Sequence, residues 1–359
     1  MFLVSDTPRR GAGGLRISIT NRTLKFKQPA RTSRGEYTTR LSRYVDVCND
    51  DGIHGVGECA TLPDLSCDEV AGYDSILRQF CDMIERTGRI PYDMMRPYPS
   101  MLFGLETAFA QIDACGSFAL FDTPFARGEA GIPTNGLVWM GDYDQMLERM
   151  QRKLDDGFKC IKIKIGAIGF DREVELLSIL RSAFPQSAVE LRLDANGAFD
   201  PDEAMALLDI LAHYDIHSIE QPIRQRQWRD MARLCASSPI PIALDEELIG
   251  VNLRPMKEML LDTIRPQYIV LKPSLHGGMA GTTEWVSLAR QRGICSWMTS
   301  ALESNVGLNA IAHLAAKTYH GTGIMPQGLG TGQLFTENVE MPIELRGERM
   351  WFKPINYGN

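Results

Sequence analysis

The feature that most constrains the fold is a charged residue that recurs at the end of successive short apolar runs. Each run is prone to form a β-strand and is followed by turn-forming residues. The charged residues follow one another at intervals of 30, 26, 25 and 27 residues. A strand, a loop and a covering helix together need roughly 30 residues, so each interval fits one strand and helix unit. The charged residues are Lys164, Asp194, Glu220, Asp245 and Lys272.

If these units close into a barrel, the charged residues meet at one end of it, because the carboxyl ends of parallel strands converge on one face. Asp194, Glu220 and Asp245 would then surround one point and would repel one another strongly in a partly desolvated cleft. Oxygen ligands in this arrangement suit Mg²⁺, with Mn²⁺ as a possible substitute. Lys164 and Lys272 end strands on either side of the carboxylates. The pattern therefore predicts a metal ion between two amines.

Each of these residues, taken alone, also has an ordinary explanation as a helix N-cap or a solvated loop charge. Capping does not require five charges in this order after apolar strands, so it explains the whole row poorly. Lys162 shares strand parity with Lys164, and both side chains should therefore point the same way. An inward lysine without a carboxylate neighbour would be costly, so we expect one beside Lys162.

The composition is that of a globular chain with two hydrophobic cores. The chain has 359 residues, is 44% hydrophobic and carries a net charge of −7, which argues against a nucleic-acid surface. No apolar run is long enough to span a bilayer and no signal segment follows the first residues, so we expect a cytoplasmic protein with no membrane partner. The eight cysteines lack CxxC spacing, which favours free thiols over disulfides or zinc ligands. Oligomeric state stays open.

Hydrophobic patterns divide the chain into three segments. Residues 1–120 read as an α+β capping domain, with an antiparallel meander over residues 15–58 followed by helices. Residues 121–330 read as the barrel, which begins with a strand over residues 134–140 and ends with a weaker one near residues 323–328. Residues 331–359 have no helix pattern, and we expect them to pack back on the capping domain.

Three loops are candidate substrate contacts. A polar loop is predicted over residues 28–37, where basic residues could meet an anionic substrate. Small hydroxyl residues in the stretch 299–309, at the start of a helix, could bind a carboxylate, although N-capping by Ser300 or Ser304 explains them equally well. The glycines from Gly328 onward permit a close backbone approach.

Several motifs together resemble the enolase superfamily, and within it the muconate-lactonizing subgroup, which has one lysine on strand two and another on strand six. The resemblance spans nearly the entire chain. It implies an α/β barrel, specifically a modified TIM barrel of (β/α)7β form, with an N-terminal α+β capping domain. The motifs are IKIKIG, LDANGAF, IEQP, ALDEE, LKPS and SALESNVGLNAIAHLAA.

The resemblance also implies a role for each candidate residue. Lys164 would be the catalytic acid and base, and Lys272 the opposing catalytic amine. Asp194, Glu220 and Asp245 would be the Mg²⁺ ligands. The candidate substrate-binding residues are Lys162, Asn196, Ser300, Gly328, Arg34 and Tyr37.

Within the subgroup, the motifs are most similar to the o-succinylbenzoate synthase family. That family implies a carbon–oxygen lyase that dehydrates 2-succinyl-6-hydroxy-2,4-cyclohexadiene-1-carboxylate with syn geometry through an enediolate, for menaquinone biosynthesis. The alternatives are an N-acylamino-acid racemase or a dipeptide epimerase. Dipeptide epimerases typically carry an Asp-x-Asp pair at strand eight, whereas residues 325–335 contain no acid. A non-enzymatic binding barrel would be expected to lack a ligand or a base, and neither is missing here.

Overall fold

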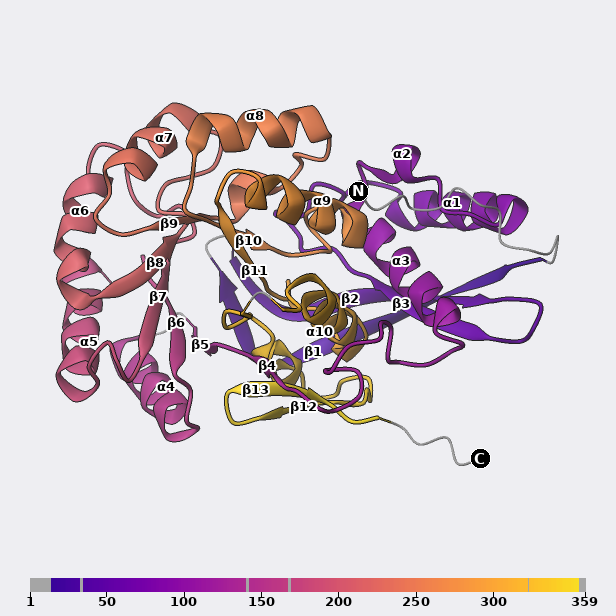
Figure 1. Ribbon diagram of the computed structural model, residues 1–359, viewed down its shortest axis with the longest axis horizontal. Helices are drawn as coiled ribbons and strands as arrows, with labels where there is room; N and C mark the ends of the chain where they lie inside the picture. Colours follow the sequence, from indigo (N-terminus) through magenta and orange to yellow (C-terminus); the bar gives the residue numbers. More distant parts are fainter. Residues whose placement is uncertain (1–13, 33–34, 140–141, 167–168, 322, 355–359) are drawn as a thin grey trace.

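The computed structural model describes residues 14–32, 35–139, 142–166, 169–321 and 323–354. The predicted substrate contact Arg34 lies outside these residues. Figure 1 shows a curved sheet surrounded by helices on one side and a small sheet with its own helices on the other. In the described part of the chain, no helix combines the length and the apolar character needed to cross a membrane. All eight cysteines are free thiols, as predicted.

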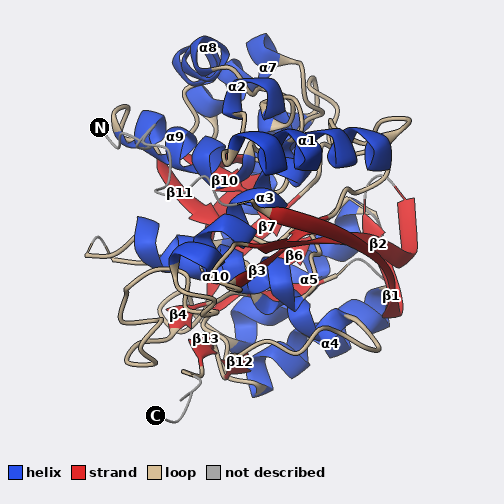
Figure 2. Cartoon of the chain, turned by 90° about the vertical axis from the view of Figure 1, so that its right-hand side faces the viewer, coloured by secondary structure: helices blue, strands red, loops and turns tan. Residues whose placement is uncertain are grey.

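The N-terminal part is a three-stranded antiparallel sheet covered on one face by helices (Figures 1 and 2). Val45 and Val47 are fully buried in the core between the sheet and the helices. Helix α3 approaches strand β3 so closely that a Cβ atom at Gly57 would lie 1.7 Å from the carbonyl oxygen of Gly104, so this contact requires glycine. The elements are β1 (Arg16–Thr32), β2 (Gly35–Cys48), β3 (His54–Cys59), α1 (Tyr73–Thr87), α2 (Tyr92–Met95) and α3 (Pro99–Asp113).

The predicted polar loop over residues 28–37 is wrong. Strand β1 extends to Thr32 and β2 begins at Gly35, and Ala30 pairs with Tyr37 in the antiparallel ladder. The hydrophobic alternation stops near Gln28 and Pro29 because the register shifts between Lys25 and Ala30. The sequence pattern of this irregular part of the hairpin therefore resembles that of a loop.

The central part forms a curved sheet of seven parallel strands, paired in sequence order from β5 to β11, with helices outside it (Figure 1). In β6, Ile161 and Ile163 pack in the core with residues of α5, which turns Lys162 and Lys164 toward the inside of the barrel. The strands of this sheet are β5 (Gly136–Val138), β6 (Cys160–Lys164), β7 (Glu190–Asp194), β8 (Ile216–Glu220), β9 (Ile242–Leu244), β10 (Tyr268–Leu271) and β11 (Cys295–Met298). Strand β4 (Ile132–Pro133) precedes them and belongs to a separate small sheet.

One helix follows each of the seven strands from β5 to β11. Helix α4 begins after its N-cap Asp142, whose carboxylate accepts a hydrogen bond from the backbone N–H of Gln145. The helices are α4 (Tyr143–Asp155), α5 (Phe170–Ala183), α6 (Ala204–Leu211), α7 (Trp228–Ser237), α8 (Arg254–Ile264), α9 (Gly278–Arg290) and α10 (Asn305–Thr318), with 3₁₀ turns η1 (Ala212–Tyr214) and η2 (Glu246–Leu248).

A short eighth segment closes the barrel between β11 and the start of β5. The backbone of Gln327 bonds to residues on either side of Thr134, and the N–H of Gly328 donates to the carbonyl oxygen of Met298 at 2.8 Å. The two parallel bridges lie within the predicted weak strand at residues 323–328. The fold is therefore the expected modified (β/α)7β barrel with an N-terminal capping domain.

The C-terminal segment contacts both parts of the molecule. Phe335 stacks on Phe26 of β1, with ring centroids 4.6 Å apart. The following hairpin instead pairs with β4, through Met350 and Ile132. The elements are η3 (Gly330–Leu334), β12 (Ile343–Arg346) and β13 (Arg349–Phe352).

Buried carboxylates of the capping domain hold the N-termini of two barrel helices. Glu106 of α3 accepts hydrogen bonds from two backbone N–H groups in the first turn of α9. Glu58 of β3 accepts from the N–H groups of Ser304 and Gly307 at α10, each at 3.0 Å. A negative charge is favourable at a helix N-terminus. These contacts fix the capping domain over the barrel end where β10 and β11 stop.

We expect the substitution Glu58→Ala to lower the free energy of unfolding by about 3 kcal/mol, because it removes charge-assisted hydrogen bonds and leaves buried donors of α10 without acceptors. Glu58 is fully buried, whereas Glu340 is exposed and serves as the control position. Urea denaturation of both alanine variants measures the difference. An equal, small loss in the two variants would contradict this role of Glu58.

Candidate active site

The charged residues of the predicted row lie at the carboxyl ends of neighbouring barrel strands. Lys164, Asp194 and Glu220 are the last residues of β6, β7 and β8, and they are direct partners in the parallel ladder. Asp245 and Lys272 follow the last residues of β9 and β10. The apolar strand residues before them pack outward in the core, which presents the charged ends together at one face of the barrel.

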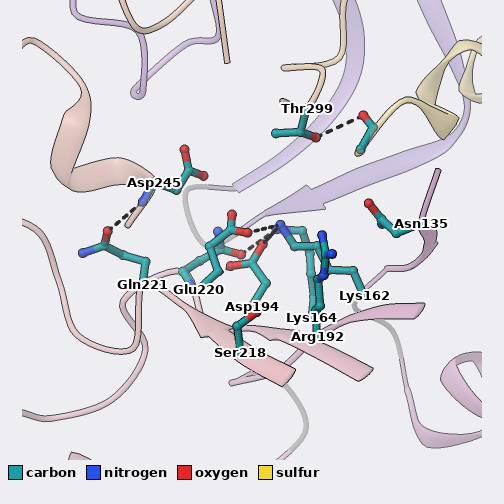
Figure 3. Close-up of polar contacts among 12 residues, drawn as sticks. Asn135, Lys162, Lys164, Arg192, Asp194, Ser218, Glu220, Gln221, Asp245 and Thr299 are labelled. Carbon is teal, nitrogen blue, oxygen red and sulfur yellow. Dashed lines mark hydrogen bonds and ion pairs between the residues drawn. The ribbon is translucent and has the colours of Figure 1, made fainter. Parts of the chain in front are cut away.

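The amines of Lys162 and Lys164 pair with the carboxylates of Asp194 and Glu220 (Figure 3). The Nζ atom of Lys162 lies 2.9 Å from Asp194 Oδ2 and 2.6 Å from Glu220 Oε2. Lys164 Nζ lies 3.0 Å from the same Asp194 oxygen. Lys162 therefore has the carboxylate neighbours that an inward lysine requires.

Asp245 does not share the amines of Lys162 and Lys164 but bonds to a different lysine. Its Oδ2 atom bonds to the Nζ of Lys272, while its Oδ1 atom lies 3.9 Å from the Nε2 atom of His276. Among the residues that the structure describes, no three His, Cys, Asp or Glu side chains are arranged as a ready cage for a metal ion. The reason is visible in the pairing, because the carboxylate oxygens are turned toward lysine amines. The common ion for the three carboxylates stays a prediction.

The donor set nevertheless fits a divalent cation. Two of the predicted ligands each have one buried carboxylate oxygen, Glu220 Oε1 and Asp245 Oδ1, without a hydrogen-bond partner among the described residues. A buried acceptor without a partner is unfavourable, and a hard cation is a ligand that such oxygens bind well. Asp194, Glu220 and Asp245 are each 2% exposed or less. An ion at this place would satisfy oxygens that the protein itself leaves unsatisfied.

Burial and the charges of neighbouring side chains shift the pKa values of the site residues. Burial raises the pKa of Glu220 to about 8, and the negative charge of Asp194 adds to the effect. Burial alone would lower the pKa of Lys162, but Asp194 and Glu220 outweigh it and hold that pKa above its usual value. Asp245 likewise outweighs burial and raises the pKa of Lys272. Both lysines therefore stay charged at neutral pH.

A pocket opens above this row and is mostly apolar apart from it. The empty space in it, including the open mouth, is about 780 Å³. Lys164 and Lys272 both line it. The remaining lining residues are Leu62, Leu65, Asn135, Leu137, Trp139, Lys162, Asp194, Asn196, Glu246, Thr299, Ser300, Ala301, Leu302, Gly328, Gly330 and Thr331.

The structure brings some of the predicted substrate contacts to this pocket and not others. Lys162, Asn196, Ser300 and Gly328 line it. Tyr37 does not belong to the described lining, and its hydroxyl donates to the carbonyl oxygen of Pro63 at 2.8 Å. The capping domain contributes Leu62 and Leu65 instead. Those two residues lie in a loop without hydrophobic periodicity, so the sequence carried no signal for them.

Both hydrogen-bond donors of Ser300 already have partners in the protein. Its hydroxyl donates to Glu303 Oε2 at 2.7 Å, and its backbone N–H donates to the carbonyl oxygen of Gly328 at 3.0 Å. Ser304, rather than Ser300, is the N-cap of α10, with its hydroxyl accepting from the N–H of Val306. A substrate carboxylate at Ser300 would therefore compete with Glu303, and binding there stays a prediction.

Comparison with known protein families gives a match over residues 145–350 to the family model described as enolase C-terminal domain-like. The o-succinylbenzoate synthase of Desulfotalea psychrophila is 42% identical, over 93% of this chain and 98% of that protein. The o-succinylbenzoate synthase of Thermosynechococcus vestitus is 27% identical, over 80% of this chain and 85% of that protein.

Solved structures agree with the fold. The crystal structure of MenC from Desulfotalea psychrophila is 40% identical, with a TM-score of 0.80 over 94% of this chain and 99% of that one. The L-Ala-D/L-Glu epimerase from Bacillus subtilis superimposes with a TM-score of 0.82 at 21% identity, over 95% of this chain and 97% of that one. At that identity the second likeness supports the fold alone.

Proposed function

The chain belongs to the enolase superfamily, and from that premise we propose that it is a metal-dependent carbon–oxygen lyase with o-succinylbenzoate synthase activity. Its substrate is 2-succinyl-6-hydroxy-2,4-cyclohexadiene-1-carboxylate, and its place in the cell is the cytoplasm, in menaquinone biosynthesis. The observation that carries the proposal is that Lys164 and Lys272, from strands on either side of the carboxylates, both line one pocket. The similarity to o-succinylbenzoate synthases over nearly the whole chain supports the choice of reaction.

Asp194, Glu220 and Asp245 would hold Mg²⁺. When bound, the ion stabilises negative charge that develops on the substrate carboxylate, an effect worth several kcal/mol. The amine of Lys162 bonds to two of these carboxylates and offsets their mutual repulsion. Lys272, whose pKa is raised by Asp245, supplies a second positive charge on the other side of the pocket.

The reaction needs one group that takes a proton and returns it. Neutral Lys164 removes the proton from the carbon next to the ring carboxylate, and the electron pair of the broken C–H bond moves into the carboxylate as an enediolate. The lysine, now charged, gives the proton to the departing hydroxyl oxygen. The C–O bond breaks, water leaves, and the ring becomes aromatic. Both transfers take place at one Nζ atom, so they use the same face of the ring.

The pocket walls would hold the rest of the substrate. Leu62 and Leu65 close the site from the capping side and exclude water, which strengthens the electrostatic interactions inside. We propose that the succinyl carboxylate lies toward Ser300 and Gly328, on the part of the rim formed by the end of β11 and the eighth segment. Asn196 would contact Lys164 rather than the substrate, since its amide oxygen accepts from Lys164 Nζ at 2.6 Å.

An N-acylamino-acid racemase is the second candidate, because two amines on opposite sides of a carboxylate site can exchange an α-proton in either direction. The absence of acids in residues 325–335 makes a dipeptide epimerase the weaker alternative.

Parallel assays in deuterated water separate these functions. We expect the purified protein with Mg²⁺ to convert the cyclohexadiene carboxylate to o-succinylbenzoate, measured by the absorbance of the aromatic product. N-acyl amino acids are offered in the same buffer, and deuterium at their α-carbon is followed by NMR. Rapid racemisation without any dehydration would overturn the lyase proposal in favour of the racemase.

A further inference from the structure

Glu246 is a buried carboxylate in the pocket that the mechanism above does not use. It follows Asp245, begins the 3₁₀ turn η2 and is 5% exposed. Its Oε1 atom accepts a hydrogen bond from Nδ2 of Asn196 at 2.8 Å. Its side chain is part of the pocket lining, as is that of Lys164. The turn η2 therefore places the carboxylate of Glu246 in the pocket, where it is hydrogen-bonded to Asn196.

The contact with Glu246 determines which way the amide of Asn196 faces. A carboxylate oxygen accepts hydrogen bonds, so the NH₂ group of Asn196 turns to Glu246 and the amide oxygen turns to Lys164. That oxygen accepts from Lys164 Nζ at 2.6 Å. The backbone of Asn196 adopts a left-handed conformation, with φ of +46°, and its N–H donates to Asp194 Oδ1 at 3.1 Å. The residue is thus held at both its backbone and its side chain.

Lys164 therefore meets two acceptors on the protein side, Asn196 Oδ1 and Asp194 Oδ2. A neutral lysine amine has two N–H bonds and one lone pair. If the two acceptors take the two N–H bonds, the lone pair occupies the remaining direction, which is left for the pocket that Lys164 lines. After the amine gains a proton, the new N–H bond occupies that same direction.

We propose that Glu246 is a positioning residue that acts through Asn196 to aim the lone pair of Lys164 into the pocket. The inference rests on the proposed function, because it concerns the amine that removes the substrate proton. A glutamine at residue 246 can donate as well as accept, so it no longer dictates one orientation of the Asn196 amide, which can then turn and donate to Lys164. The lone pair would then bond to Asn196 instead of the substrate.

The substitution Glu246→Gln tests this, and Glu247→Gln is its matched control. Glu247 is the next residue, is also fully buried, and bonds to the N–H of Arg226 and to Nε1 of Trp228, away from Lys164. We expect Glu246→Gln to lower kcat about 10- to 100-fold, the usual effect of removing a supporting partner, while KM and the Kd for Mg²⁺ change by less than about threefold. Glu247→Gln should leave kcat within about threefold. Equal losses of kcat in the two variants would overturn the proposal.

A second variant moves the amide to residue 246 and the carboxylate to residue 196, so that residue 196 again presents an acceptor oxygen to Lys164. In the double variant Glu246→Gln with Asn196→Asp, the glutamine amide donates to the aspartate, whose other oxygen accepts from Lys164. We expect its kcat to exceed that of either single variant by about tenfold. A double variant no better than the poorer single variant would contradict an orienting role.

A readout without substrate or metal separates this inference from the proposed function. The side-chain amide signals of Asn196 are identified in ¹⁵N spectra by their absence from Asn196→Asp. They should shift in Glu246→Gln and stay in place in Glu247→Gln. Unchanged signals in Glu246→Gln would overturn the inference even in an active enzyme. If the wild-type protein does not dehydrate the cyclohexadiene carboxylate, the proposed function fails, and these spectra still decide whether Glu246 orients Asn196.

Discussion

Replacing Lys164 by alanine is expected to lower kcat by about 10³- to 10⁴-fold, the full range usually assigned to a general acid and base. The loss should be this large because one amine serves both proton transfers, and because the neighbouring Lys162 is occupied by Asp194 and Glu220. KM should change little, since the proposed role is in proton transfer and not in binding. Steady-state kinetics on the cyclohexadiene carboxylate measure both parameters.

The control for this variant is Lys159→Ala, at a lysine just before β6 whose side chain is 77% exposed. It should keep wild-type turnover. Calorimetric titration should give a Kd for Mg²⁺ in Lys164→Ala within about tenfold of wild type, because the three carboxylates remain. Turnover by Lys164→Ala at more than a tenth of the wild-type rate would exclude this lysine as the base.

Glu220→Gln is expected to weaken Mg²⁺ binding by at least about 100-fold and to reduce turnover at low Mg²⁺ by a similar factor. Supporting partners of metal ligands already account for 10- to 100-fold effects, so a residue that itself binds the ion should exceed them. Glu220 occupies the middle of the carboxylate row, and its Oε1 atom has no partner among the described residues. The glutamine side chain keeps the size and loses the charge. Calorimetry on metal-free protein measures the affinity directly.

The control substitution is again Glu247→Gln, which removes a buried carboxylate of the same barrel rim. Its affinity for Mg²⁺ should stay within about threefold of wild type. If Glu220→Gln binds Mg²⁺ as tightly as Glu247→Gln does, Glu220 is not a metal ligand.

The arrangement of the barrel was predictable because the length of the apolar runs and the spacing of the charged residues that end them both fit repeated strand and helix units. Apolar runs of strand length end on charged residues, and the intervals between those residues match one strand and helix unit. In β6, the alternation of isoleucines with Lys162 and Lys164 specified which side chains point inward. The three carboxylates and three lysines consequently lie at one end of the barrel, as expected. What each of them binds was not predictable from spacing.

The capping domain was predicted less well, because its contacts depend on loops and on irregular strands. Pro29 and Gln28 interrupt the alternation of β1, so a continuous hairpin was interpreted as a loop. Leu62 and Leu65 reach the pocket from a segment with no repeat. Glu246 stands next to Asp245 in the sequence, but only the geometry of the turn η2 reveals that its carboxylate faces Asn196. Such contacts join residues far apart in the chain, and no local pattern encodes them.

The most direct test is dehydration of the cyclohexadiene carboxylate by protein stripped of metal with a chelator and then supplied with Mg²⁺. The account predicts that turnover falls by at least about 100-fold in the stripped protein and returns fully with Mg²⁺, because Asp194, Glu220 and Asp245 then share an ion between the two amines. Full turnover by the metal-free protein would contradict it.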